Sequence, residues 1–217
     1  MNVEQARFNM IEQQIRPWDV LDSSILELLS IIRREDFVPA AHRSQAFMDV
    51  ELPLGNGRFL LAPRVEARLV QSLNLSKSDT VLQVGAATGF VTALLAHKAQ
   101  RVVALEADAT LASATRANLR QAAVNNAEVV EGQGLDGLPQ QAPFDAILLC
   151  GSVPTVSQDL LDQLKVGGRL LAVVGQGPMM QTTLFTRVSN TQFSKKELFD
   201  TVIARLPGVT EPSQFQF

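Results

Sequence analysis

One stretch of small residues could place bare backbone against a ligand: Gly85, Ala86, Ala87, Thr88 and Gly89. It follows an apolar run, 80–84, that is typical of a buried parallel strand, and it precedes a helical pattern that begins at Phe90. The first N–H groups of such a helix have no partner within it and point toward the turn. The next apolar run ends in Glu106, followed by Ala107, and a carboxylate there could accept hydrogen bonds from ribose hydroxyls. The turn and Glu106 together predict a site for a nucleoside-containing cofactor.

The spacing of the glycines argues against a dinucleotide. A dinucleotide site uses Gly-x-Gly-x-x-Gly, but Ala87 and Phe90 stand where the second and third glycines belong. Gly-x-x-x-Gly followed by an aromatic residue instead resembles the first motif of S-adenosylmethionine-dependent methyltransferases. On this motif alone, a purely structural turn in another α/β domain is the alternative.

The composition limits the class of protein. The chain has 217 residues, of which 46% are hydrophobic and 19% are charged, so it can bury the core of one large α/β domain with an appendage. The net charge of −3 argues against binding to nucleic acid or to an anionic membrane. No apolar run is long enough to span a bilayer. Cys150 is the single cysteine, which predicts a reducing cytoplasm, and the isolated His42 and His97 predict no metal site.

The first 79 residues predict helices and a covering loop packed on the main domain. Residues 1–16 carry apolar positions at helical spacing, and Pro17 ends that helix. Asp19 is interpreted as the N-cap of a second amphipathic helix. Residues 33–63 show little periodicity, which predicts an irregular wall or lid over the pocket.

From Thr80 onward the pattern alternates between strands and helices. Strands are predicted at 80–84, 101–106, 127–131, 144–149 and 169–174, and helices at 90–98, 108–123 and 157–165, the last with Gly167 as its C-cap. This alternation predicts a doubly wound, mostly parallel, Rossmann-like sheet over 80–217. Two later runs, 182–188 and 197–206, have no helix between them and predict an antiparallel hairpin at the sheet edge.

Sequence blocks along nearly the whole chain resemble the protein-L-isoaspartate O-methyltransferase family. They are Gln14-Ile15-Arg16-Pro17, Arg34-Glu35-Asp36-Phe37-Val38-Pro39, Pro53-Leu54-Gly55-Asn56-Gly57, Val81 to Phe90, Glu106, Gly132-Gln133-Gly134, Pro143-Phe144-Asp145 and Gly167-Gly168-Arg169-Leu170. The resemblance implies a methyltransferase fold and S-adenosyl-L-methionine as the cofactor. It also implies a carboxylate of damaged protein as the methyl acceptor, and hence a role in protein repair.

The resemblance implies a set of cofactor contacts. They would come from Gly85, Ala86, Ala87, Thr88, Gly89, Phe90, Glu106, Ala107, Gln133 and Gly134. Gln133 stands where the family has an acidic residue, and its amide oxygen can still accept a hydrogen bond from an adenine amine.

A substrate loop is implied at 57–63, and here the chain departs from the family. The family loop reads Gly-x-Gly-Gln-Thr-Ile-Ser-x-Pro and contains a catalytic serine. Aligned on Gly55, Gly57 and Pro63, the chain has Arg58, Phe59, Leu60 and Leu61 in place of Gln, Thr, Ile and Ser. Because Leu61 cannot hydrogen-bond an acceptor, no catalytic residue is assigned. Arg58 is interpreted as a solvated loop residue in preference to a new anion contact.

The chemistry of methyl transfer indicates what this loss means. The reaction is an in-line displacement on an activated sulfonium, and an anionic carboxylate acceptor needs no general base. Loss of the serine therefore weakens acceptor orientation more than the reaction itself. The leading hypothesis is an O-methyltransferase whose acceptor is a protein or peptide carboxylate or an unknown small molecule. The alternatives are a catalytically impaired cofactor- or protein-binding module, and an RNA methyltransferase, which the net charge disfavours.

Overall fold

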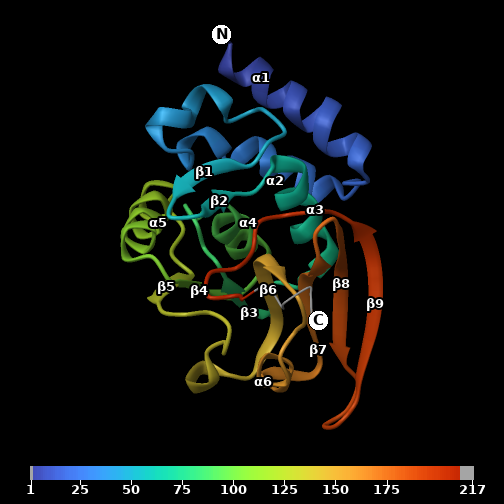
Figure 1. Cartoon of the computed structure of the whole chain (residues 1–217). Coiled ribbons are helices and arrows are strands. Elements are labelled where there is room, and N and C mark those ends of the chain that lie inside the picture. The colour runs from blue at the N-terminus through green and yellow to red at the C-terminus, as the bar shows by residue number, and fades with distance from the viewer. Residues whose placement is uncertain (1, 211–217) are drawn as a thin grey trace, which may run out of the picture.

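A seven-stranded sheet forms the centre of the structure, a computed structural model that describes residues 2–210 (Figure 1). In spatial order the strands are β5 (Ala127–Glu131), β4 (Arg101–Glu106), β3 (Thr80–Val84), β6 (Phe144–Val153), β7 (Leu164–Gln176), β8 (Met179–Arg187) and β9 (Phe193–Asp200). The first five are parallel, and at one edge β8 runs antiparallel to β7 and β9 runs antiparallel to β8. The predicted fold class, with its terminal hairpin, is confirmed.

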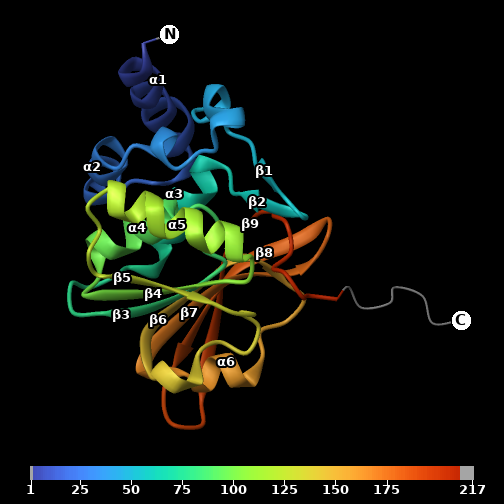
Figure 2. The same cartoon turned by 90° about the vertical axis from the view of Figure 1, so that its left-hand side faces the viewer.

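Helices cover both faces of this sheet, which is why its central strands are almost wholly apolar. Figure 2 shows α3 (Pro63–Leu73), α4 (Phe90–Lys98) and α5 (Ala109–Gln121) on one side and α6 (Gln158–Asp162) on the other. Alternate residues of each strand face opposite cores: Val81 packs with the N-terminal helices and α4, whereas Leu82 packs toward α6. The helices α1 (Val3–Met10) and α2 (Ser23–Ile31) thus share one core with the sheet. The predicted boundary at residue 79 stays a prediction.

The connection between the first two helices differs from the prediction. Helix α1 continues through a π-helical turn (Ile11–Ile15) and a 3-10 turn (Arg16–Trp18), and Asp19 then adopts a left-handed conformation with φ 60°. A side chain that caps a helix is typically carried by a residue with extended backbone, which Asp22 has and Asp19 lacks. The cap of α2 is Asp22, whose carboxylate accepts from the Ser24 N–H at 2.8 Å. The interpretation of Asp19 as the cap was wrong by three residues.

The segment 33–63 is more regular than predicted. It contains 3-10 turns at Arg34–Asp36 and Ala40–Gln45, and a hairpin of β1 (Leu52–Gly55) and β2 (Arg58–Leu60). The hairpin turn is Asn56-Gly57, with φ values of 49° and 70°. An Asn-Gly pair favours such a turn because both residues tolerate positive φ. The prediction of an irregular segment overlooked this signal.

The C-terminal part also corrects two predictions. The helix predicted at 157–165 is only the short α6, because β7 already begins at Leu164, so Gly167 lies within a strand and is not a C-cap. The strand predicted at 197–206 is β9, which ends at Asp200. Residues 201–207, the C-terminal segment, then leave the sheet edge and run back across it (Figure 1). They pair with the extended end of β6, where Ser152 N–H donates to Ala204 O at 2.8 Å.

Candidate cofactor and acceptor site

The turn between β3 and α4 lies at the carboxyl end of the sheet, beside the end of β4. The N–H groups of Gly85 and Ala86 donate to Leu105 O at 2.9 and 3.1 Å. The parallel register, which pairs Val84 with Leu105, then brings Glu106 next to the turn. This is the edge at which ligands bind to open α/β sheets.

Glu106 is a fully buried carboxylate with three donors. The Ala87 N–H donates to Oε2 at 2.8 Å, and the Asp108 N–H donates to Oε1 at 3.0 Å. The third donor is the guanidinium of Arg58, which forms an ion pair with Oε1. A buried carboxylate needs such partners because desolvation penalises an unpaired charge.

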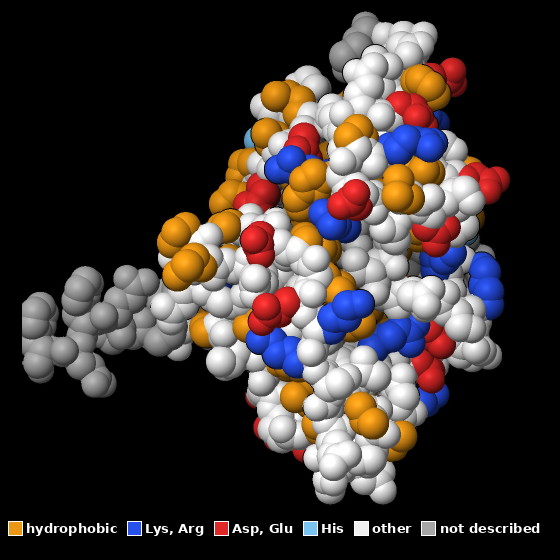
Figure 3. Space-filling view, turned by 90° about the vertical axis from the view of Figure 1, so that its right-hand side faces the viewer, with side chains coloured by type: hydrophobic (Ala, Val, Ile, Leu, Met, Phe, Trp, Pro, Cys, Tyr) orange, Lys and Arg blue, Asp and Glu red, His pale blue; other side chains and the backbone are white. Residues whose placement is uncertain are grey.

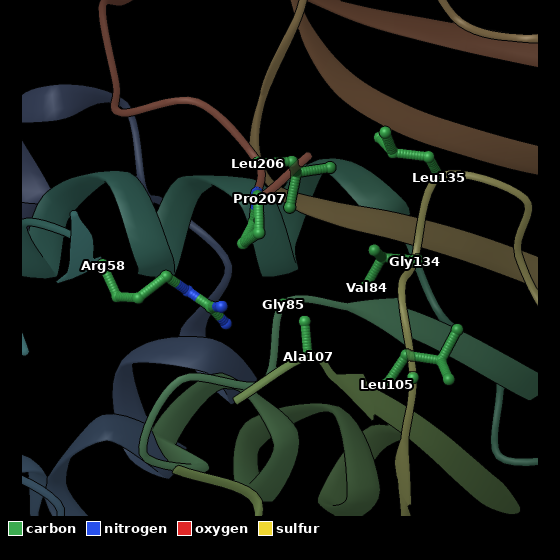
Figure 4. A pocket seen from close by; sticks show the side chains of 10 residues that line it. Arg58, Val84, Gly85, Leu105, Ala107, Gly134, Leu135, Leu206 and Pro207 are labelled. Carbon is green, nitrogen blue, oxygen red and sulfur yellow. The ribbon is translucent and has the colours of Figure 1, made fainter. Parts of the chain in front are cut away.

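Arg58 is not the solvated loop residue that the sequence suggested. It starts β2 of the hairpin, and its side chain is only 13% exposed because it reaches down to Glu106. Figure 4 shows it directed into the cleft, toward Gly85 and beneath Leu206 and Pro207. That interpretation was therefore wrong, since the anion that Arg58 contacts is a carboxylate of the chain itself.

A small cavity lies between the carboxyl ends of β3, β4 and the loop after β5 (Figure 4). We call it the nucleoside chamber. Its lining is mostly apolar or backbone: Val84, Gly85, Leu105, Ala107, Gly132, Gly134 and Leu135, closed by Arg58, Leu206 and Pro207. Gly134 is required there, because a Cβ at this position would collide with Cγ1 of Val84.

A second small cavity also borders Arg58, and we call it the acceptor chamber because residues of the predicted substrate loop line it. Its lining comprises Arg58, Phe59, Leu61, Gly85, Ala87, Glu106, Cys150, Ala204, Arg205, Leu206 and Pro207. The residues that line both chambers, and therefore separate them, are Arg58, Gly85, Leu206 and Pro207. Among the described residues that line it, none carries a hydroxyl.

Cys150 is the thiol in this chamber. Desolvation raises its pKa to about 12, opposed by a hydrogen bond from Gln83, whose Nε2 lies 3.4 Å from Sγ, and assisted by the charge of Glu66. The thiol is therefore neutral at physiological pH and is neither a base nor a nucleophile there.

The structure brings together about half of the predicted site residues. Those that line a chamber are Gly85, Ala87, Glu106, Ala107, Gly134, Arg58, Phe59 and Leu61. Phe90 instead packs in the core, with its ring centroid 5.6 Å from that of Phe37, and Leu60 is buried opposite Leu52. The remaining predicted residues line neither chamber: Ala86, Thr88, Gly89, Gln133, Gly57 and Pro63.

Residues of the C-terminal segment also belong to the site, although none was predicted from the sequence. Leu206 packs against the turn between β3 and α4. A Cβ placed on Gly85 of that turn would lie 3.2 Å from Cδ2 of Leu206. Arg205 donates from Nη1 to Gly175 O at 2.7 Å. No local pattern marks these residues as part of a site, since their apolar spacing reads as a strand. For metals, residues 2–210 contain no cluster of three or more His, Cys, Asp or Glu side chains that could bind an ion.

Comparison with known proteins adds to this geometry. The family model described as protein-L-isoaspartate(D-aspartate) O-methyltransferase matches residues 5–207. The chain belongs to this family. A protein-L-isoaspartate O-methyltransferase of Koribacter versatilis is 34% identical over 202 residues, which are 93% of this chain and 90% of that protein. One of Methanoculleus marisnigri is 39% identical over 171 residues, or 79% and 78% of the two chains.

Solved structures show the same fold. A protein-L-isoaspartate O-methyltransferase superposes with a TM-score of 0.78 at 22% identity, covering 95% of this chain and 66% of the other. A putative member from Plasmodium falciparum, in complex with S-adenosyl-L-homocysteine, gives 0.77 at 18%, covering 95% and 98%. The predicted family is thus confirmed, and with it the S-adenosylmethionine-dependent O-methyltransferase class.

The residues of this family member fit the cofactor that its relatives imply. Glu106 is buried at the end of β4 beside the turn, and the nucleoside chamber has a largely apolar lining with glycine where a Cβ would collide with Val84. The interior position of Thr88 is less expected, because its buried Oγ1 has no partner. The side chain of Arg58 forms its ion pair with the Glu106 carboxylate that a ribose would also need.

Proposed function

We propose that this protein methylates a carboxylate of damaged protein, with S-adenosylmethionine as the donor, and so takes part in protein repair in the cytoplasm. The observation that carries the proposal is the position of Glu106, buried at the end of β4 and hydrogen-bonded to the Ala87 N–H of the turn. A carboxylate held in this way is preorganised to accept hydrogen bonds from ribose hydroxyls.

The cofactor would lie across the ends of β3, β4 and β5. Glu106 would hold the ribose, and the base would enter the nucleoside chamber once Arg58, Leu206 and Pro207, which close it, move aside. Gln133, which lies between the lining residues Gly132 and Gly134, would accept from an adenine amine. Bound S-adenosylmethionine supplies a methyl group on a positively charged sulfur. The methyl carbon is attacked from the side opposite the sulfur, so the protein must place the acceptor oxygen in line with that bond.

The acceptor chamber supports this reaction by its position and by the apolar part of its lining. Phe59, Leu61 and Leu206 lie there beside charged side chains, and an acceptor that displaced water from the chamber would strengthen the electrostatic interactions inside it. A carboxylate acceptor is already anionic, so no side chain has to remove a proton. The neutral thiol of Cys150 fits this requirement.

A second candidate is a catalytically impaired member that binds the cofactor or a protein partner. The lining of the acceptor chamber motivates it, because no hydroxyl among the described lining residues could orient a carboxylate. Leu61 occupies the position of the serine, and its side chain offers no hydrogen bond.

Calorimetry with S-adenosylhomocysteine and methylation of an isoaspartyl peptide separate the two candidates. Leu61→Ser combined with Phe59→Thr restores hydroxyls to the loop and should raise peptide methylation. The matched control is Leu60→Ser, because Leu60 lies outside both chambers. Cofactor binding without methylation by either protein would favour the binding module. A folded protein that does not bind S-adenosylhomocysteine would contradict the proposal that the protein is a methyltransferase.

The proposed partners are protein or peptide carboxylates or an unknown small-molecule acceptor, with no nucleic acid and no membrane. On the face in Figure 3, basic and acidic side chains alternate and form no single basic patch. No helix within residues 2–210 has both the length and the apolar character needed to cross a membrane.

A further inference from the structure

The ion pair between Arg58 and Glu106 joins the two chambers of the site. We propose that Arg58 is an acceptor-binding residue that Glu106 holds until the cofactor arrives: the ribose displaces the guanidinium, which then binds the carboxylate of the acceptor. The inference rests on the proposed function for the identity of the acceptor. It does not rest on it for the competition at Glu106.

The competition follows from the hydrogen-bond capacity of one carboxylate. Its two oxygens offer about four acceptor positions. In Glu106, the Ala87 and Asp108 N–H groups occupy two of them and Arg58 occupies a third. A ribose that donates from two hydroxyls needs two positions, and Arg58 is the donor that can leave, because the other two are backbone groups of the turn and of the α5 N-cap.

The hairpin that carries Arg58 is built to move at its tip. The tip residues Asn56 and Gly57 are exposed, and a Cβ at Gly55 or Gly57 would meet nothing within 4 Å. The side chain of Asn56 contacts the N-cap of α5, with its Nδ2 donating to Asp108 Oδ2 at 3.3 Å. The base of the hairpin is held in the core by Leu52 and Leu60, so only its tip can shift without breaking packing.

The acceptor chamber is where a displaced guanidinium would act. Arg58 already lines it, next to Phe59 and Leu61, whose apolar side chains leave an acceptor carboxylate without a partner. A planar guanidinium can bind a carboxylate through two parallel hydrogen bonds. Arg205, the other arginine of this lining, is engaged with Gly175 O and Ser152 Oγ. The loop that lost its hydroxyls thus has a cation in their place.

Titration with S-adenosylhomocysteine alone tests the competition. Arg58→Gln should bind S-adenosylhomocysteine about 10-fold more tightly than the wild type. The wild type must break the charged hydrogen bond between Arg58 and Glu106 before the ribose binds, and the free energy of that bond corresponds to a factor of about 10 in affinity. The same variant should have a lower melting temperature without ligand, because Glu106 loses its cation. The exposed Arg43→Gln is the matched control and should change neither quantity. Unchanged or weaker binding by Arg58→Gln would overturn the competition.

A second titration, at saturating S-adenosylhomocysteine, tests the acceptor role with an isoaspartyl peptide. Arg58→Gln should weaken peptide binding at least about 10-fold, and Arg58→Lys should restore part of it. Equal binding by wild type and Arg58→Gln would overturn the acceptor role and leave the proposed function intact. A peptide that binds neither protein would instead overturn the proposed acceptor, and the role of Arg58 with it.

Discussion

Nε of Arg34 lies 2.8 Å from Oε2 of Glu66, and both side chains are almost completely buried. Arg34 also donates to Ala46 O at 2.6 Å and to Leu61 O at 2.8 Å. The pair therefore fixes the end of the substrate loop to the first turn of α3. This interior cation holds the backbone at Leu61, next to the acceptor chamber.

Loss of Arg34 should destabilise the fold strongly. Arg34→Met leaves Glu66 buried without its cation, and breaking such a pair costs about 3–5 kcal/mol. The double variant Arg34→Met/Glu66→Met should recover much of that loss. Urea unfolding measures both. A loss below about 1 kcal/mol for the single variant would contradict this role.

The pH dependence of the same variant is a separate prediction. Desolvation raises the pKa of Glu66, opposed by the charge of Arg34 and its hydrogen bond. For a carboxyl group with a raised folded pKa, the protonated form favours folding, and this contribution is lost as the pH rises through the folded pKa. The deficit of Arg34→Met should therefore shrink as the pH falls from 7 toward about 4.5. Urea unfolding curves across that range measure the difference in free energy of unfolding between the wild type and Arg34→Met. A difference that does not change with pH would contradict a raised pKa for Glu66.

Gly134 and Gly132 form a matched pair for the nucleoside chamber. A Cβ on Gly134 would collide with Val84, whereas one on Gly132 would lie at an ordinary 3.7 Å from Leu105. Gly134→Ala should lower both stability, by about 1–3 kcal/mol, and affinity for S-adenosylhomocysteine. Gly132→Ala should leave the affinity within a few fold. Calorimetry on the two variants would contradict the geometry if they behaved alike.

Ala87 is a non-glycine residue in a left-handed conformation, with φ 53°. Ala87→Gly should stabilise the protein by about 0.5–1 kcal/mol, because relief of the left-handed strain exceeds the added entropy of the unfolded chain. Ala86→Gly is the control, since Ala86 has no positive φ and should lose stability. Denaturant midpoints of the two variants should move in opposite directions.

Asp22 caps α2, and its charge should matter at acid pH. The hydrogen bond from the Ser24 hydroxyl is the largest cause that lowers the pKa of Asp22. A carboxyl group whose pKa is lowered by folding stabilises the folded state at pH values above its pKa in the unfolded chain. This stabilisation is lost as the pH falls through its pKa in the folded state. Asp22→Ala should cost about 1 kcal/mol at pH 7 and less near pH 3. Asp19→Asn, which keeps a residue that tolerates positive φ, should change little.

Cys150 should resist alkylation in the folded protein. With a pKa raised to about 12 by desolvation, it has almost no thiolate at pH 8. Iodoacetamide should label it slowly at pH 8 and rapidly after addition of denaturant. Rapid labelling of the native protein, followed by mass spectrometry, would contradict a desolvated thiol.

The sequence by itself determined the parts of this protein that depend on neighbours in the chain. The bounds of β3, β4 and β5 follow from short apolar runs, and Glu106 is found because it ends one of them. The substrate loop could be located by its glycines and Pro63, and the loss of its serine was visible as Leu61. These signals are local, so they survive without knowledge of the packing.

Only the tertiary structure decided which distant groups meet. Arg58 and Glu106 are 48 positions apart, and no periodicity links them. Leu206 lies in the site because the chain leaves the sheet after Asp200, the last residue of β9. The C-terminal segment then packs the Leu206 side chain against Gly85. A local pattern shows that a residue is apolar or charged. Its partner depends on how the layers pack, because burial leaves a charge or an apolar side chain only the neighbours that the fold supplies.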